Sequence, residues 1–196
     1  MVLFINACAR SCSRTKRLAD ELIKKIGEPV REVRLLDIDM PRVDEEFLKT
    51  KDALLEKEAY DSPRFALARE FAAAEKIVVA APYWDLSFPA ILKQYFEQIN
   101  VMGITFSYTS DGFPQPLCKA KVLYYVTTAG GAFCPEEYGY GYVKALAENF
   151  YGIKNVKLIK AVGFDIDGAD ESQILQEAID YIKTYADLYS DDAYEL

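Results

Sequence analysis

Short apolar runs and amphipathic stretches follow one another along the whole chain. Four apolar runs and one stretch that alternates between apolar and charged residues, 30–36, predict five strands. They cover residues 2–8, 30–36, the stretch IVVAAPYW after Lys76, the stretch VLYYVTTA after Lys121, and LIKAVGFDI at 158–166. Apolar residues at spacings of three and four predict helices over 15–26, 63–75, 89–99, 143–150 and 170–186.

The alternation of strands with helices predicts an α/β fold with a parallel sheet, because parallel neighbours need a crossover connection and helices supply it. The 196 residues are expected to form one domain, 1–196. Two connections are longer than the rest. Residues 37–62 are charged and allow a short helix around 45–58, and residues 101–118 form a loop with room for a short hairpin at 105–108.

Composition narrows the classes of partner. The hydrophobic fraction of 51% excludes a disordered chain, and the net charge of −8 argues against nucleic acid or an anionic membrane as the main partner. No apolar run approaches the roughly 20 residues that a membrane span requires. No basic segment precedes the first apolar run, so we expect no signal peptide and a cytoplasmic protein.

The sequence contains no histidine and four cysteines, none of them in a C-x-x-C pair. A zinc site is therefore not expected, and no other metal site is predicted. The commonest general base and every Ser-His or Cys-His arrangement are also absent. If the protein is an enzyme, something other than such a side chain must carry the chemistry.

Three loops follow predicted strands and should meet at one edge of the sheet. They are residues 9–15, 82–88 and 127–133. In open parallel sheets, ligands bind beyond the carboxyl ends of the strands, where the strand order reverses. This convergence predicts a binding site at that edge.

The first loop combines hydroxyl groups with cations at the start of a helix. Ser13 and Thr15 supply hydroxyls, and Arg10 and Arg14 supply positive charge where the helix dipole is also positive. A phosphate group at the helix N-terminus would account for all of them. The alternative is that Ser13 or Thr15 only caps the helix and that the cations are solvated.

The other two loops suit a planar ring. The second holds Pro82, Tyr83, Trp84, Asp85 and Leu86, whose aromatic side chains can pack flat on a ring. The third holds Thr128, Ala129, Gly130 and Gly131, where glycine allows close approach to the backbone. The alternatives are a hydrophobic lid over the core and an ordinary glycine turn. Taken together, the three loops fit a mononucleotide with a large planar ring.

Three motifs carry a resemblance to a known family over residues 2–182. These are SRT before Lys16-Arg17-Leu18, APYWDLSFPAILKQYFE followed by GITFSY, and TTAGG. The combination resembles the flavodoxin-like NAD(P)H:quinone oxidoreductases and FMN-dependent azoreductases. The resemblance implies a three-layer sandwich around a five-stranded parallel sheet of order 2-1-3-4-5. It also implies tightly bound FMN, NADH or NADPH as reductant, and a homodimer.

In the enzymes that the chain resembles, two electrons pass by ping-pong hydride transfer through FMN to a small-molecule acceptor such as a quinone or an azo compound, and no catalytic side chain is needed. The resemblance places the FMN phosphate at Arg10, Ser13, Arg14 and Thr15. It places the ring beside the five residues from Pro82 to Leu86 and the four from Thr128 to Gly131. Many azoreductases have Asn where this chain has Asp85, so this carboxylate either tunes the flavin or is turned away. A flavodoxin-type electron carrier and a flavin-free phosphate-ester binder are the alternatives.

Overall fold

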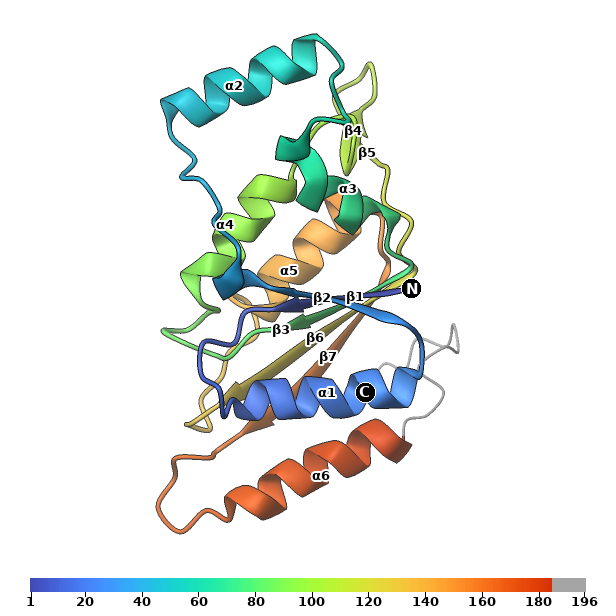
Figure 1. The fold of residues 1–196 in the computed structure, drawn as a ribbon. Coiled ribbons are helices and arrows are strands. Elements are labelled where there is room, and N and C mark those ends of the chain that lie inside the picture. Colours follow the sequence, from blue (N-terminus) through green and yellow to red (C-terminus); the bar gives the residue numbers. More distant parts are fainter. Residues whose placement is uncertain (185–196) are drawn as a thin grey trace.

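Five parallel strands form the central sheet of the computed structural model, which describes residues 1–184. Their order is β2-β1-β3-β6-β7 (Figure 1). The strands are β1 (Val2–Asn6), β2 (Val30–Arg34), β3 (Lys76–Ala80), β6 (Val122–Ala129) and β7 (Asn155–Val162). A separate two-stranded sheet pairs β4 (Phe106–Tyr108) with β5 (Pro114–Pro116). The predicted strand order 2-1-3-4-5 is confirmed, because β6 and β7 are the fourth and fifth strands of the main sheet.

Strand β1 lies between two parallel neighbours. Val2 stands opposite Val30 of β2 and Lys76 of β3, and the register continues without a bulge to Asn6. All five residues of β1 are buried, as expected of a strand covered on both faces. The edge strand β2 buries only Val33, and three of its five residues are charged, as an exposed strand allows.

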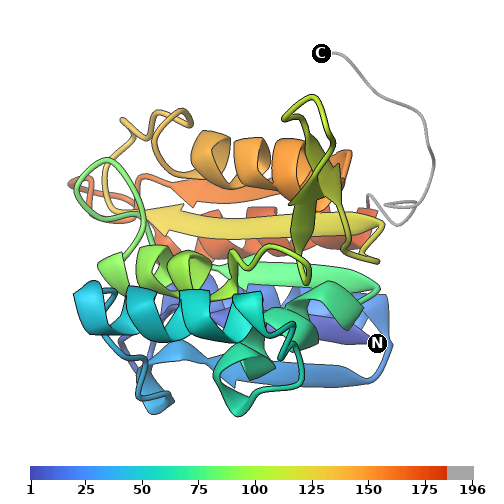
Figure 2. The same cartoon turned by 90° about the horizontal axis from the view of Figure 1, so that it is seen from above.

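Helices cover both faces of the sheet and make the predicted three layers. On one face lie α1 (Arg14–Ile26) and α6 (Glu171–Thr184), and on the other lie α3 (Ala66–Ala73), α4 (Ala90–Ile99) and α5 (Tyr140–Leu146) (Figures 1 and 2). Helix α2 (Glu45–Glu56) lies farther from the sheet, beyond α4, and buries only Phe47 completely. Within residues 1–184, no helix is long and apolar enough to cross a membrane.

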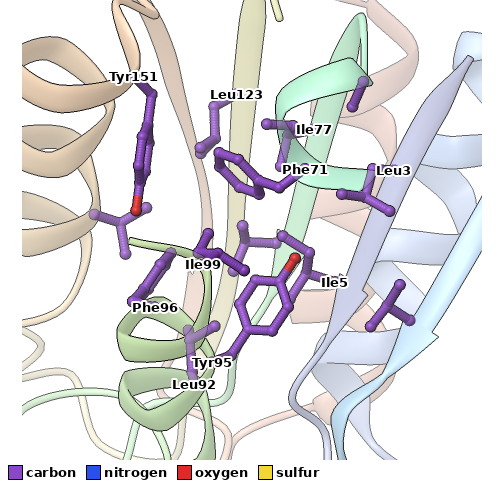
Figure 3. Packing of buried hydrophobic residues seen from close by; sticks show 14 of the residues in the cluster. Leu3, Ile5, Phe71, Ile77, Leu92, Tyr95, Phe96, Ile99, Leu123 and Tyr151 are labelled. Carbon is purple, nitrogen blue, oxygen red and sulfur yellow. The ribbon is translucent and has the colours of Figure 1, made fainter. Parts of the chain in front are cut away.

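The sheet divides the core in two. Leu3 and Ile5 of β1 face the side of α3, α4 and α5, where they join Phe71, Tyr95 and other large buried residues (Figure 3). Val2 and Phe4 face the side of α1 and α6. This alternation is the period of two that a strand imposes on its side chains.

Helix α1 ends at Ile26 as predicted and begins at Arg14, one residue before the predicted start. The hydroxyl of Ser13 accepts a hydrogen bond from the backbone N–H of Lys16, so Ser13 is the N-cap. Gly27 closes the helix with a φ of +67°, a left-handed conformation that glycine adopts without a steric penalty.

Several predicted boundaries are wrong. Strand β1 ends two residues before the predicted limit of 8, and β2 gives way at Leu35–Asp37 to a turn of 3₁₀ helix. Strand β7 starts at Asn155 and stops at Val162 instead of spanning 158–166, because Gly163 takes a φ of +89° and turns the chain out of the sheet.

The helix predictions need similar changes. The predicted helix 63–75 is a 3₁₀ turn, Pro63–Phe65, followed by α3, and Pro89 is the N-cap of α4 and lies outside its first turn. Helix α5 continues into a π-helical turn, Ala147–Tyr151. The hairpin extends beyond the predicted 105–108, because β4 pairs with a second strand, β5, at Pro114–Pro116. The last two residues of the predicted helix 170–186 lie outside the described residues.

Candidate functional site

The three predicted loops meet at the carboxyl edge of the sheet. The hydroxyl oxygens of Thr15 and Thr128 lie 2.6 Å apart and link the first loop to the third. The backbone N–H of Tyr83 donates to the carbonyl of Thr128 at 3.0 Å and links the second loop to the third. Figure 1 shows the chain leaving β1, β3 and β6 at the same end of the sheet. The predicted convergence is confirmed.

Hydrogen bonds of Asn6, the last residue of β1, hold the start of the first loop. Asn6 is fully buried, and its side-chain oxygen accepts from the N–H of Cys8 at 2.9 Å while its amide donates to Glu32 at 2.7 Å. The loop then exposes Ser11 and Cys12 before α1 begins. Among the described residues, the N–H groups of Arg14 and Thr15 have no hydrogen-bond partner. The positive end of α1 therefore presents two backbone donors at this edge.

The cations of the first loop have different surroundings. The guanidinium of Arg14 donates to Asp165 at 3.0 Å and to Glu171 at 2.9 Å, and it lies 4.9 Å from the ring centre of Phe164. The hydrogen bond to Glu171, followed by that to Asp165, raises the pKa of Arg14. These two carboxylates offset the cost of placing a cation at the N-terminus of a helix.

Arg10 stands apart from this cluster. Its side chain is exposed and makes no ion pair with any of residues 1–184. Lys16, by contrast, pairs with Asp20 one turn along α1 at 2.8 Å. Arg10 is therefore the loop cation whose charge is available to an incoming anion.

The second loop contains a tight turn in an unusual conformation. Trp84 and Ser87 exchange two backbone hydrogen bonds, of 2.9 and 2.8 Å, around Asp85 and Leu86. These two central residues have φ angles of +50° and +70°. Asp and Asn tolerate the first of these positions, so turn geometry gives a reason for Asp85 that does not involve a ligand. Leu86 is strained there, since the left-handed region is unfavourable for a branched side chain.

The turn leaves Trp84, Asp85 and Leu86 exposed at the edge of the sheet. Pro82 and Tyr83 are half-buried beneath them. The hydroxyl of Tyr83 is buried without a hydrogen-bond partner in the described part of the chain, and loss of contact with water raises its pKa. The Ser87 hydroxyl donates to the carbonyl of Tyr138 at 2.6 Å, so the second loop is fixed to the segment that follows the third.

The third loop turns its carbonyl groups toward β7. The N–H of Gly163 donates to the carbonyls of Ala129 and Gly131 at 3.1 and 3.2 Å, and the N–H of Asp165 donates to the carbonyl of Gly130 at 2.8 Å. In a planar trans peptide, the N–H points opposite to the carbonyl. The N–H groups of Gly130 and Gly131 therefore point away from β7, and neither has a partner within residues 1–184.

The loop after β7 is a part of the site that the sequence analysis missed. Phe164, Asp165 and Glu171 contact Arg14, and Gly163 and Asp165 hold the glycine loop. The predicted strand 158–166 placed Asp165 inside the sheet and so concealed this loop. The glycines on either side of the Asp-Ile-Asp sequence were the available signal, because glycine and aspartate together favour a turn.

Comparison with known proteins places this architecture in a family. The family model described as flavodoxin-like fold matches residues 1–186. The chain belongs to this flavodoxin-like family. It is 35% identical over 194 residues to an FMN-dependent NADH:quinone oxidoreductase of Clostridium beijerinckii, covering 94% of this chain and 97% of that protein. A protein of the same name from Lachnoclostridium phytofermentans is 35% identical over 187 residues, with 90% and 92% coverage.

Solved structures support the same flavodoxin-like fold. An azoreductase from Bacillus anthracis superposes with a TM-score of 0.81 at 21% identity, over 94% of this chain and 97% of that one. A second structure, an FMN-dependent NADH-azoreductase from Bacillus anthracis in complex with FMN, has a TM-score of 0.76 at 22% identity, with 94% and 96% coverage. At these identities the likeness concerns the fold.

Proposed function

We propose that this protein is an FMN-dependent oxidoreductase that passes two electrons from NADH to a quinone or an azo compound. The observation that carries the proposal is the pairing of two sets of unpartnered backbone donors at one edge of the sheet. One set, at Arg14 and Thr15, suits a phosphate, and the other, at Gly130 and Gly131, suits the polar edge of a ring. The names of the relatives at 35% identity support the same assignment.

The phosphate end of the proposed site has both dipole and charge. The phosphate oxygens would accept hydrogen bonds from the N–H groups of Arg14 and Thr15 at the start of α1. The hydroxyl of Ser13 can also donate to the phosphate while its oxygen caps the helix. Arg10 would supply the balancing positive charge. Arg14 is already paired with two carboxylates, so its contribution to the phosphate would come through its backbone more than through its guanidinium.

The ring end combines open backbone with exposed apolar surface. Gly130 and Gly131 present N–H groups and carry no side chains of their own, and Trp84 and Leu86 are exposed on the second loop, which is bonded to the third loop through Tyr83. The buried pair Thr15 and Thr128 fixes the spacing between the two ends of the site. Such a surface fits a flat, polar-edged ring, so the residues present fit FMN.

The residues of the site indicate what FMN and the protein would each contribute to the reaction. FMN, when bound, supplies the hydride and electron chemistry, which explains why a chain without histidine can be a redox enzyme. The chain binds the cofactor, orients it with backbone donors, and leaves one side accessible to reductant and acceptor in turn. Backbone donors at the glycine loop would also stabilise negative charge that develops at the polar edge of the ring.

We also propose that the protein works as a homodimer. Phe133 and Tyr138, in the segment after the glycine loop, are 77% and 61% exposed. The Ser87–Tyr138 hydrogen bond joins Tyr138 to the second loop, on which Trp84 is also exposed. Aromatic residues so exposed at a site are typical of a surface that another chain covers. Light scattering of the purified protein should give twice the mass of the chain, and a monomeric mass at micromolar concentration would contradict this part.

The test of the proposed function has two stages. The purified protein, incubated with FMN and freed of excess cofactor, should show the visible absorption bands of bound flavin. It should then oxidise NADH in proportion to added menadione. Bound flavin without turnover would favour an electron carrier, and no flavin binding would favour the phosphate-ester binder.

A further inference from the structure

We infer that Asp165 is a positioning residue that keeps the N–H groups of the glycine loop directed at the flavin ring. The inference rests on the proposed function, because it concerns the ring end of that site. It adds residues from the loop after β7, which contributes nothing to the resemblance from which the site was first predicted. Three independent contacts carry it.

The first contact is a backbone bond. The N–H of Asp165 donates to the carbonyl of Gly130 at 2.8 Å, and Gly163 donates to the carbonyls on either side, those of Ala129 and Gly131. Because carbonyl and N–H point in opposite directions in each peptide, these bonds determine where the N–H groups of Gly130 and Gly131 point. The loop after β7 thus sets the direction of the donors.

The second contact is steric. A Cβ atom on Gly130 would lie 2.0 Å from a carboxylate oxygen of Asp165 and 2.7 Å from its carboxyl carbon. The Asp165 side chain therefore occupies the space where a side chain at position 130 would be. A side chain at position 130 would therefore displace the Asp165 side chain, and φ has no part in this, since Gly130 is not among the glycines with positive φ.

The third contact fixes the Asp165 side chain itself. Arg14 donates to Asp165 at 3.0 Å and to Glu171, in the first turn of α6, at 2.9 Å. The Asp165 side chain is 67% exposed, so the packing around it is loose and Arg14 is the partner that restrains it. Arg14, Asp165 and Gly130 form a chain of contacts from the start of α1 to the glycine loop.

Two possible roles of Asp165 can be distinguished by the affinities of two flavins. If Asp165 acts on the glycine loop, its loss weakens binding of the ring, and FMN and riboflavin lose affinity by the same factor. If Asp165 acts instead by tuning the charge of Arg14 toward the phosphate, FMN affinity changes and riboflavin affinity does not. Riboflavin has the ring of FMN and lacks its phosphate.

The experiment titrates flavin-free protein with FMN and with riboflavin, using flavin fluorescence for affinity and visible circular dichroism for the orientation of the bound ring. The variants are Asp165→Ala, which removes the side chain, and Gly130→Ala, which displaces it. Asp167→Ala, an exposed change two residues away, is the matched control. Thermal unfolding of each flavin-free variant reports whether the fold itself is affected.

Asp165→Ala keeps the backbone N–H that donates to Gly130 and removes only the side chain beside that glycine. We expect it to weaken both flavins about tenfold, the value of one hydrogen bond between the glycine loop and the ring. Gly130→Ala should give the same altered dichroism, and Asp167→Ala should match the wild type. An Asp165→Ala variant whose affinities and dichroism equal those of Asp167→Ala would overturn the inference, as would a loss confined to FMN. A wild-type protein that binds neither flavin would overturn the proposed function and the inference with it.

Discussion

Replacing Thr15 with valine tests whether the phosphate loop and the glycine loop are joined by a buried hydrogen bond. The hydroxyls of Thr15 and Thr128 are 2.6 Å apart, and the two residues are 1% and 8% exposed. Valine keeps the branched shape of threonine and fills the same space. The main change is therefore the loss of one hydroxyl, which leaves the other buried without its partner.

The magnitude follows from the asymmetry of buried hydrogen bonds. An unsatisfied buried hydroxyl costs about 1–3 kcal/mol, whereas replacing both partners by apolar groups is nearly neutral. The added buried methyl of valine returns up to about 0.8 kcal/mol. We therefore expect Thr15→Val to lower the free energy of unfolding by about 1–2 kcal/mol, and the double variant Thr15→Val/Thr128→Val to lose less than the sum of the two single changes.

The assay is urea unfolding of flavin-free protein, followed by far-UV circular dichroism and analysed as a double-mutant cycle. Flavin is left out so that binding does not add to the stability. A coupling energy above about 1 kcal/mol would support the link. Strict additivity of the two single changes, or a loss below about 0.3 kcal/mol for Thr15→Val, would refute the reasoning.

Three further predictions test other features. Leu86→Gly should leave the melting temperature unchanged or raise it, because it relieves a φ of +70°. The control Leu48→Gly, at an equally exposed leucine within α2, should lower the free energy of unfolding by about 1 kcal/mol. A fall in melting temperature for Leu86→Gly would contradict the strained turn. Iodoacetamide at pH 8 should label the exposed Cys12 but not Cys118, because burial raises the pKa of Cys118 to about 12. Bound FMN should slow the labelling of Cys12. Mass spectrometry of the labelled protein measures both effects. Gly103→Ala should lower the free energy of unfolding by about 1–3 kcal/mol, measured in urea, since its Cβ would lie 2.6 Å from the Tyr60 ring at a φ of +86°; an unchanged midpoint would show that the ring yields freely.

The sheet could be predicted because its three central strands are buried and its strands are bounded by turn residues. The five predicted strands lie between charged or glycine-containing segments, and parallel connectivity then leaves few possible orders. The convergence of the three loops follows from that order alone. Packing was not needed for either conclusion.

The parts that sequence reasoning missed depend on contacts between distant segments. Arg14 could be recognised as a cation at a helix start, but its pairing with Asp165 and Glu171 spans more than 150 residues. Strand β5 was missed because it contains two prolines, which cannot donate to a ladder and are rare in strands except at edges. The two-stranded sheet that it forms with β4 has two edges and no centre, so the prolines are tolerated there.

One measurement tests the central claim most directly. The FMN-loaded protein is mixed without oxygen, first with one equivalent of NADH and then with one equivalent of menadione. The account predicts that NADH abolishes the visible absorption band of the bound flavin and that menadione restores it, with one NADH consumed for each menadione reduced. A band that NADH leaves unchanged, or one that menadione fails to restore, would contradict the claim that this protein is an FMN-dependent NADH:acceptor oxidoreductase.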